Sequence, residues 1–264
     1  MTNCLLAYNL IPYQAKDITP SYTENSLFPV WNLLTNKRSD FVAIGASGWS
    51  IIFDLGLDSA GADIEKACEF ILLANATTTL PSSGTFYLDY SDDNISYSNA
   101  TSFTNTDASA ALKGLMRADY IKTFTATSAH RYWKIRTATT TSEGLSKCYF
   151  GTFLDFEVEP NDIKDDFERQ KFFIADGGYS TYGISQPEIR KYKLEWKGIT
   201  KAKLAEFESI IKTLPRNPLF FIYLQTVTDI LNGENLVAVT LVDYDYEFLS
   251  DDYINLTIDF KDSY

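Results

Sequence analysis

The stretch "SSGTFYLDYSDDNISYSNAT", residues 82–101, passes from a strand pattern into a turn pattern within a few positions. Phe86, Leu88 and Tyr90 recur at every second residue, so they leave one face of an extended strand while the residues between them leave the other. The Ser-Asp-Asp-Asn run that follows favours a tight turn, because short polar side chains bond to nearby backbone N–H groups and tolerate left-handed backbone angles. We therefore expect a hairpin whose apolar face belongs to a core and whose polar tip is exposed.

The composition of the 264-residue chain favours a β-rich globular protein. Hydrophobic residues make up 45% of it and aromatic residues 15%, and Tyr and Phe suit half-buried pleated surfaces. A net charge of −12 excludes a nucleic-acid-binding protein, which needs clustered Lys and Arg. No run approaches the roughly 18 apolar residues of a membrane span, and no basic region precedes the short apolar N-terminal stretch. We expect a chain made in a cytoplasm, with no membrane insertion.

Short strands separated by polar turns are predicted from residue 13 to residue 160, which we assign to one domain. The compact apolar run "WSIIFDL" at 49–55 is closed by a glycine and favours a strand buried on both faces. "RYWKIRT" at 131–137 and "CYFGTFLDFEVEP" at 148–160 are β by propensity. The polar, acidic stretch "NDIKDDFERQ" at 161–170 is typical of a joint between domains.

An α+β pattern occupies residues 161–264, the second expected domain. "YKLEWKG" at 192–198 alternates as a strand, and Thr200 is a good N-cap for an amphipathic helix of about residues 200–214. Three further strand patterns follow, at 218–224, 236–249 and 253–262. Residues 1–12 precede the first domain, and we leave open their pairing with the second.

The sequence offers no catalytic motif. Cys4, Cys68 and Cys148 lack metal-ligand spacing and are expected as buried thiols. The one histidine, His130, has no nucleophile and acid beside it in the sequence, which favours a structural or solvent-exposed side chain. A pair of carboxylates that hydrolyses a glycoside stays open as an alternative, because sequence does not show which carboxylates meet.

Two acidic clusters lie in the second half of the chain, at 162–168 and 243–252. Neither has the glycine-centred spacing of an EF-hand calcium loop. A charge run is usually a solvated face, so we expect solvated surfaces or subunit contacts there, and no metal site.

Aromatic and exposed polar side chains are the remaining functional signal. Sugar rings stack on Tyr and Trp and bond to amide, carboxylate and guanidinium groups. Core positions are favoured over a sugar platform for the large aromatics, since most are buried; these are Trp31, Trp49, Tyr97 and Trp133. Two polar loops are expected at an exposed rim as candidate ligand-binding residues: Asn36, Arg38 and Asp40 in one, and Asp92, Asp93 and Asn94 in the other.

Three motifs of the first half, taken in order, resemble the discoidin or galactose-binding-like β-sandwich. "GWSIIFDLG" is similar to that family's strand ending in Asp-Leu-Gly, here Asp54, Leu55 and Gly56, and "FYLDYSDDNISYSN" and "AHRYWKIRT" are similar to its central and late strands. The resemblance implies a jelly roll and carbohydrate binding. The family's Asp-Gly-Asn loop is replaced by "NKRSDFVAIGASG", so no calcium site or sugar-contacting residue is carried over.

The second half resembles distal and minor tail proteins of long-tailed bacteriophages. In "KYKLEWKGITKAKLAEFESIIKTLPRNPLFFIYL", residues 191–224, a strand ending in Trp-x-Gly-hydrophobic-Thr meets an amphipathic helix and then an aromatic-rich strand. The resemblance implies a tail-type β-sandwich with a flanking helix that assembles into rings. We expect the assembly interface at helix residues Leu204, Phe207 and Ile211.

The expected function is that of a non-enzymatic virion component at the tail tip or baseplate, made in the host bacterial cytoplasm. The second domain is expected to form a homo-oligomeric ring with tube, hub and fibre proteins as neighbours. The first domain is expected either to bind cell-surface glycan or to dock other tail proteins. No cofactor is expected. The alternatives are a free-standing carbohydrate-binding module and a glycan-degrading enzyme.

Overall fold

The structure of the protein is a computed structural model, and the description below covers residues 4–8, 11–24, 26–27, 29–34, 42–44, 48–75, 85–104, 120–137, 143–158, 160, 162–168, 173–176, 181–184, 189–213, 219–224 and 236–262. It is mainly β with antiparallel sheets, as the sequence predicts. The chain forms two compact units. We call Leu6–Leu154 the sandwich unit, and Met1–Leu5 with Asp155–Ser263 the C-terminal unit.

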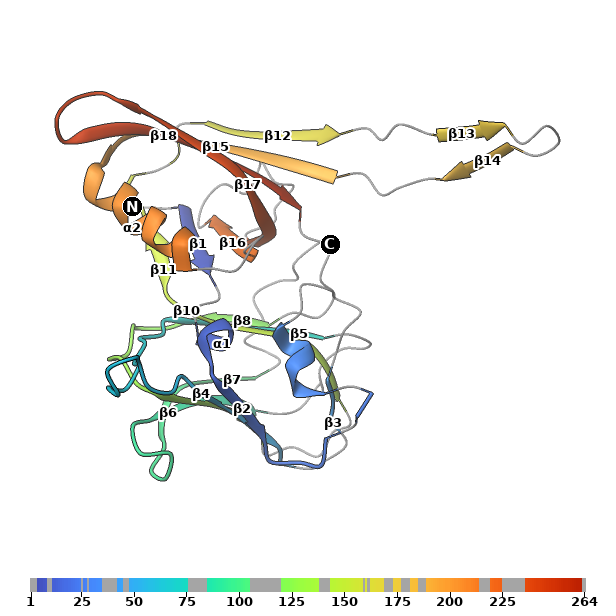
Figure 1. Cartoon of the computed structure of the whole chain (residues 1–264), viewed down its shortest axis with the longest axis vertical. Coiled ribbons are helices and arrows are strands. Elements are labelled where there is room, and N and C mark those ends of the chain that lie inside the picture. The colour runs from blue at the N-terminus through green and yellow to red at the C-terminus, as the bar shows by residue number, and fades with distance from the viewer. Residues whose placement is uncertain are drawn as a thin grey trace. The chain divides into compact units, whose positions relative to one another are not determined.

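The sandwich unit contains two antiparallel sheets (Figure 1). The five-stranded sheet has the order β2 (Asp17–Pro20), β4 (Ser50–Asp54), β9 (Tyr132–Thr137), β6 (Thr85–Ser91) and β7 (Ser98–Thr104). The four-stranded sheet has the order β3 (Val42–Ile44), β10 (Glu143–Gly151), β5 (Phe70–Asn75) and β8 (Tyr120–Thr123). Two short helical segments accompany them, α1 (Ile11–Gln14) and the 3-10 helix η1 (Val30–Leu34).

The core of the sandwich unit lies between the two sheets. Phe53 and Trp133 from the five-stranded sheet meet Phe150 from the four-stranded sheet, with ring centroids 5.1 and 6.0 Å apart. Cys68 and Cys148 are buried free thiols, and burial raises the pKa of both, which keeps them protonated and unreactive. The prediction of buried thiols is confirmed for these two, whereas the side chain of Cys4 lies outside the described residues.

The alternation that opens the sequence analysis is confirmed in β6. Phe86 and Leu88 are buried in the core, and Tyr90 packs half-buried against it. Asp89 leaves the opposite face as expected but is also buried, which alternation does not predict. The expectation that β4 is buried on both faces is wrong, because Ile52 on its outer face is only half-buried.

The C-terminal unit is built on a seven-stranded sheet. Its order is β11 (Phe153–Asp155), β1 (Cys4–Tyr8), β16 (Leu219–Leu224), β17 (Leu236–Phe248), β18 (Tyr253–Asp262), β15 (Ile189–Thr200) and β12 (Asp162–Glu168). The N-terminal strand β1 therefore lies between β11 and β16. Strands β12 and β15 lead to and from a two-stranded pair, β13 (Phe173–Asp176) and β14 (Thr181–Ile184) (Figure 1).

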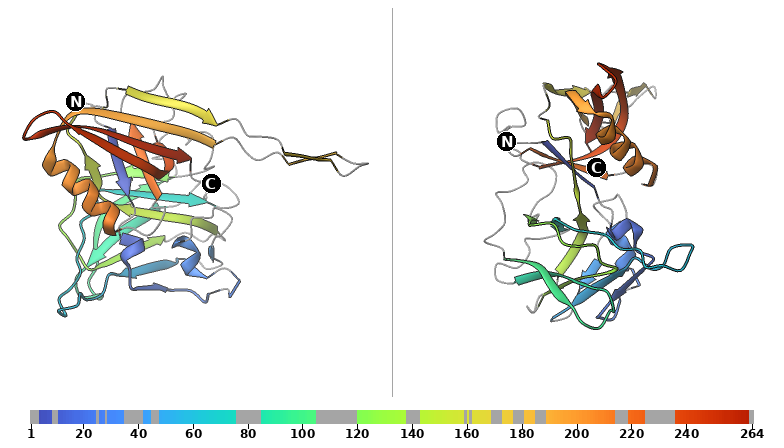
Figure 2. Two further views of the ribbon diagram at one scale, coloured as in Figure 1. Left: turned by 45° about the horizontal axis from the view of Figure 1, so that its top comes forward. Right: turned by 90° about the vertical axis from the view of Figure 1, so that its left-hand side faces the viewer.

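Helix α2 (Lys201–Thr213) lies along one face of this sheet (Figure 2). The Oγ1 of Thr200 accepts a hydrogen bond from the N–H of Lys203 at 3.4 Å, which confirms the predicted N-cap. The aromatic side chains of Phe156, Trp196 and Phe207 pack together beneath the helix, with ring centroids 4.7 to 6.0 Å apart. Among the helices of the described ranges, none is long and apolar enough to cross a membrane.

Within the expected joint at residues 161–170, Asp162–Glu168 form a strand instead. β12 pairs with β15 from Asp162↔Glu195 to Glu168↔Ile189, at the edge of the sheet. Charged side chains are common on edge strands because they discourage pairing with other chains, so the polar pattern that resembled a linker is that of a protected edge.

Candidate binding surfaces

The turn at residues 91–97, which contains three of the predicted rim residues, is held by its own polar groups. The carboxylate of Asp93 accepts hydrogen bonds from the N–H groups of Ile95 and Ser96, both at 2.8 Å, and from the hydroxyl of Ser91. These bonds lower the pKa of Asp93 to about 2. Asn94 has a left-handed φ of 58° and accepts a hydrogen bond from the hydroxyl of Tyr97. Asp93 and Asn94 thus direct polar atoms back into the turn.

Asp92 points to His130 instead, and the two belong to a larger cluster. The carboxylate of Asp92 lies 2.8 Å from Nδ1 of His130, and the hydroxyl of Ser128 lies 2.9 Å from Nε2. The imidazole ring stacks on Tyr90 with centroids 3.9 Å apart. The backbone of His130 exchanges both hydrogen bonds with Lys66. This cluster connects the turn to the start of β9.

His130 is buried and hydrogen-bonded, as a structural histidine would be, and the fold adds an acid and a hydroxyl that the local sequence did not indicate. Because a carboxylate only accepts hydrogen bonds, Asp92 places the proton of a neutral imidazole on Nδ1 and leaves Nε2 to accept from Ser128. This is the connectivity of a Ser-His-Asp triad. Ser128 is exposed and the side chain of Asp92 is 64% exposed, so water competes for both partners of the imidazole.

Asp54 and Arg131, which the sequence analysis singled out in separate motifs, form a bidentate ion pair. Nε and Nη2 of Arg131 donate to the two carboxylate oxygens of Asp54 at 2.8 and 3.1 Å, and Nη1 donates to Asp63 at 2.7 Å. Burial opposes ionisation of Asp54, but the bonds from Arg131 and from the N–H of Gly56 outweigh it and lower the pKa of Asp54. These groups join β4 to β9, and their hydrogen bonds stabilise the fold.

The remaining predicted rim residues, Asn36, Arg38 and Asp40, lie outside the described residues. Of the four aromatic candidates, Trp49 and Trp133 are buried in the core, as favoured. Trp31 is partly exposed, and Tyr97 is half-buried with the ammonium group of Lys134 over its ring.

The predicted interface residues of α2 face the sheet of their own unit. Leu204 and Phe207 are buried there, and Ile211 is half-buried. Their apolar spacing thus holds the helix on the sheet, which leaves Leu204 and Phe207 unavailable to another subunit.

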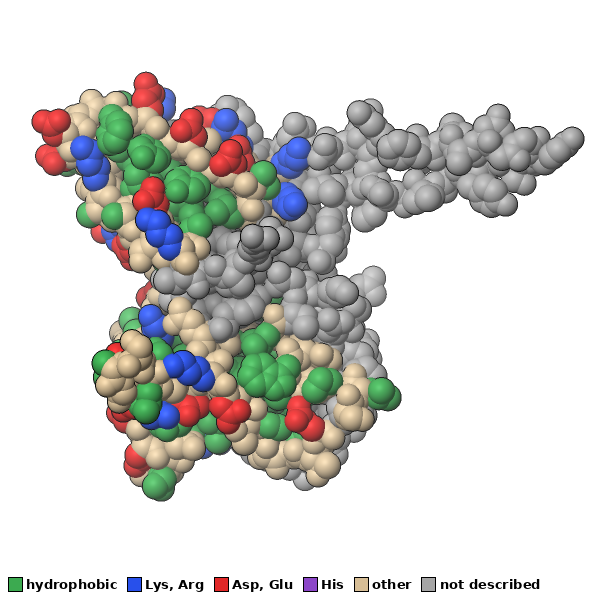
Figure 3. All heavy atoms as spheres, viewed as in Figure 1, with side chains coloured by type: hydrophobic (Ala, Val, Ile, Leu, Met, Phe, Trp, Pro, Cys, Tyr) green, Lys and Arg blue, Asp and Glu red, His purple; other side chains and the backbone are tan. Residues whose placement is uncertain are grey.

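Exposed apolar side chains gather at the end of the β17–β18 hairpin. We call these the β17 aromatic patch: Tyr246, Phe248 and Leu249, all exposed, with the rings of Tyr246 and Phe248 5.5 Å apart. Tyr246 and Phe248 lie opposite Leu256 and Ile254 in the ladder. Their side chains therefore project from the same face of the sheet as the one on which α2 lies. Figure 3 shows hydrophobic side chains gathered on this unit with charged side chains around them. Such a cluster marks an interaction surface more often than isolated exposed residues do.

The backbone beside the patch is a strand edge. β16 pairs with β17 only between Leu236 and Thr240, so among the described residues no strand pairs with residues 242–248 on the side away from β18. The N–H groups of Tyr244 and Tyr246 donate to the carboxylates of the preceding Asp243 and Asp245, at 2.9 and 2.8 Å. These carboxylates substitute for a missing neighbour strand.

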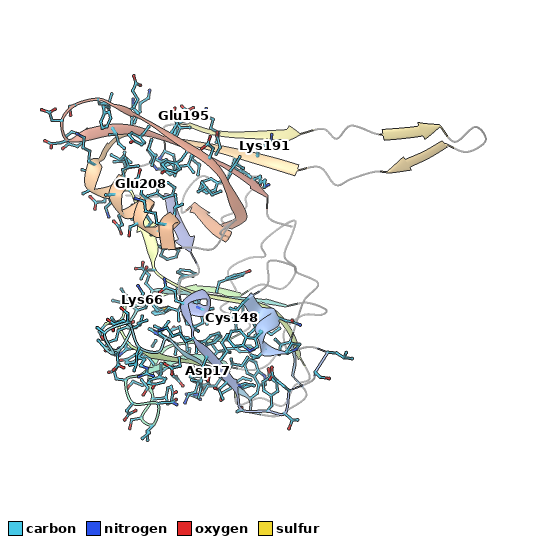
Figure 4. All side chains as sticks on the ribbon, viewed as in Figure 1. Asp17, Lys66, Cys148, Lys191, Glu195 and Glu208 are labelled. Atoms are coloured by element: carbon cyan, nitrogen blue, oxygen red, sulfur yellow. The ribbon has the colours of Figure 1, made fainter. Side chains whose placement is uncertain are left out.

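The sheet face opposite α2 has separated charges. β17 carries Asp243, Asp245 and Glu247 on it, whereas β15 carries Lys191, Lys193 and Lys197, with Glu195 among them. Figure 4 labels Lys191 and Glu195 on β15. Strand β18 separates the two rows. In the part of the chain that is described, no group of three His, Cys, Asp or Glu side chains could hold a metal ion.

No protein-family model matches the chain, and no curated protein sequence matches it. Solved structures similar to it include a fucosidase of Ruminococcus gnavus in complex with fucose, at 14% identity and a TM-score of 0.41, over 55% of this chain and 26% of the fucosidase chain. The chain thus matches about a quarter of that enzyme's length. A second is the CBM32 of AlyQ in complex with 4,5-unsaturated mannuronic acid, at 20% identity and a TM-score of 0.37, over 52% of this chain and 94% of that one. A third is a chitosan-binding module from a chitosanase/glucanase of Paenibacillus sp. IK-5, at 16% identity and a TM-score of 0.39, over 55% and 99%.

Proposed function

We propose that the protein is a structural component of the tail tip or baseplate of a long-tailed bacteriophage, made in the host cytoplasm and carried in the virion. The C-terminal unit assembles copies of the chain into a ring beside other tail proteins. The sandwich unit binds glycan on the host surface or docks a neighbouring tail protein, and a ring multiplies weak binding through avidity.

The observation that carries the assembly half of this proposal is the β17 aromatic patch. The patch lies beside a strand edge, and the opposite face of the same sheet is acidic on β17 and basic on β15. If the acidic side of one copy meets the basic side of the next, the contact is head-to-tail, and head-to-tail contacts close into rings when the rotation allows. The occupant of the patch is therefore a second copy of this chain.

Light scattering coupled to size exclusion tests the assembly half. We expect a discrete oligomer of the 29.8-kDa chain that is lost in the variant Phe248→Ser, because that side chain is 63% exposed at the centre of the patch. The matched control is Ile95→Ser, an 83% exposed residue at the turn of the sandwich unit, which should leave the oligomer intact.

Two outcomes would count against the proposal. A monomer at every concentration would contradict self-assembly and favour the free-standing carbohydrate-binding module. Hydrolysis of an oligosaccharide that stops when one carboxylate is neutralised would favour a glycan-degrading enzyme.

A further inference from the structure

The outward face of the five-stranded sheet carries a second polar cluster, which includes Tyr97 of the 91–97 turn. Lys134 and Arg136 leave β9 on this face, about 7 Å apart along the strand. In the ladder with β6, Arg136 lies opposite Tyr87 and Lys134 lies opposite Asp89. Two basic side chains, one aromatic side chain and one carboxylate thus meet at the centre of the sheet.

Asp89 anchors this cluster. Its side chain is only 4% exposed, and it accepts hydrogen bonds from Nε of Arg136 at 2.5 Å and from the amide of Asn99 at 2.8 Å. The bond through Nε orients the guanidinium group and leaves its two terminal nitrogens without an acceptor among the described residues. The forked end of Arg136 is therefore held in place, in a side chain that is 38% exposed.

Aromatic rings hold the two cations from one side. The guanidinium carbon of Arg136 lies 4.0 Å from the ring centre of Tyr87, and the ammonium nitrogen of Lys134 lies 3.3 Å from that of Tyr97. No described residue accepts a hydrogen bond from Lys134. Burial lowers the pKa of Lys134, with Asp89 opposing this and Arg136 adding to it. Two cations thus flank the carboxylate of Asp89, and the carboxylates of Asp54 and Asp93 act on Tyr97 beside them.

We propose that this surface, the Lys134–Arg136 face, binds an acidic saccharide, that is, a sugar ring carrying a carboxylate. The carboxylate accepts hydrogen bonds from the terminal nitrogens of Arg136, in the bidentate geometry that guanidinium groups favour, and from the ammonium of Lys134. The edges of Tyr87 and Tyr97 contact the apolar C–H surface of the sugar ring. The inference rests on the glycan-binding half of the proposed function and names the class of glycan.

Isothermal titration calorimetry of the full chain with trigalacturonic acid tests this inference, and the fully methyl-esterified trimer is the matched neutral ligand. We expect binding of the acid that weakens as salt is added, and at least about tenfold weaker binding of the ester, because the ester presents no charge to the two cations. Lys134→Gln should reduce affinity for the acid about tenfold. Arg136→Lys, which keeps a cation beside Asp89 but removes the fork, should do the same.

The control is Lys66→Gln, which removes a lysine of the same unit that lies away from this face and should bind as the wild type does. Equal binding of acid and ester, no binding of the acid at about 10 mM, or unchanged binding by Lys134→Gln would each overturn the inference. Equal competition by inorganic phosphate would reduce the site to one for any anion and overturn its saccharide part. Light scattering on the same Lys134→Gln sample distinguishes failure of acidic-saccharide binding from failure of ring assembly. The substitution leaves the β17 aromatic patch unchanged, so it should not alter the oligomeric state.

Discussion

At the scale of single residues, Asp93 determines how the β6–β7 hairpin responds to acid. Its folded-state pKa of about 2 lies below the ordinary value of 3.8, because the ionised carboxylate accepts two backbone hydrogen bonds. A group with a lowered folded-state pKa stabilises the fold above its unfolded pKa and loses that contribution as pH falls through the folded value. The window for this residue is therefore about pH 4 down to about pH 2.

The variant Asp93→Asn should flatten the acid dependence of stability in this window, because the amide oxygen still accepts the turn hydrogen bonds but does not titrate. Melting temperatures measured between about pH 5 and about pH 2.5 check this, with Asp251→Asn, in the exposed β17–β18 turn, as the control. An unchanged slope in Asp93→Asn would show that the carboxylate does not stabilise the folded turn.

The histidine cluster is expected to fasten the turn to β9 and not to catalyse. His130→Ala removes a ring stack and two hydrogen bonds from a buried position and should lower the free energy of unfolding by about 2 kcal/mol. Ser128→Ala, at an exposed residue, should cost at most about 0.5 kcal/mol. Chemical denaturation measures both.

An ester substrate distinguishes a structural role of the histidine cluster from a catalytic one. p-Nitrophenyl acetate should be hydrolysed at the same rate by the wild type and by Ser128→Ala. A burst of nitrophenolate that Ser128→Ala abolishes would show that the serine is a nucleophile and that the chain is an enzyme.

The clusters around His130 and Asp89 could not be predicted from the sequence, although the strands that carry them could. The period of β6 assigns Phe86 and Leu88 to the core and Asp89 to the other face, which is local information. His130 meets a residue 38 positions away, and Arg136 meets Asp89 across 47 positions. Such pairs depend on the order of strands in the sheet, which alternation does not encode.

At the scale of elements, helix α2 was predictable because its signals are local: a capping threonine, apolar residues at helical spacing and a proline after its end. Those signals do not show what the apolar face of the helix contacts. The same spacing of Leu204 and Phe207 suits packing on the core and packing against another subunit. β12 was missed for the converse reason, because a charged edge strand has the composition of a linker.

The cap of α2 gives a prediction at this scale. Thr200→Ala removes the acceptor for the N–H of Lys203 and should cost about 0.5 kcal/mol, the low end for a cap, because the hydrogen bond is long at 3.4 Å. Thr200→Asp keeps an acceptor and adds a negative charge at the helix N-terminus, so it should be at least as stable as the wild type. Denaturant midpoints rank the three proteins, and Thr200→Asp falling below Thr200→Ala would contradict the cap.

At the scale of the whole molecule, the C-terminal unit is completed by the first residues of the chain. β1 pairs between β11 and β16, so the sheet contains strands from both ends of the sequence. The expected domain division at residue 160 follows the change of composition there, whereas the structure divides the chain near residues 5 and 154.

Deletion of residues 1–5 should destabilise the C-terminal unit alone, because it removes the first residues of β1 from within its sheet and leaves the sandwich unit whole. Hydrogen exchange followed by mass spectrometry reports on each unit separately. Faster exchange is expected in β16 and β11 with β6 and β9 unchanged, and equal acceleration in both units would show that they unfold together.

The position of β1 beside β11 also makes the sandwich unit an insertion with neighbouring ends. Hydrogen-bonded strands lie about 4.8 Å apart, so the chain leaves the scaffold sheet and returns to it almost at the same place. Any domain whose own termini lie close together fits between those two strands without shifting their register, a condition that most compact domains meet. The sandwich unit is thus an insertion between two strands of the C-terminal sheet, and we expect that another compact domain could replace it while that sheet keeps its strand order.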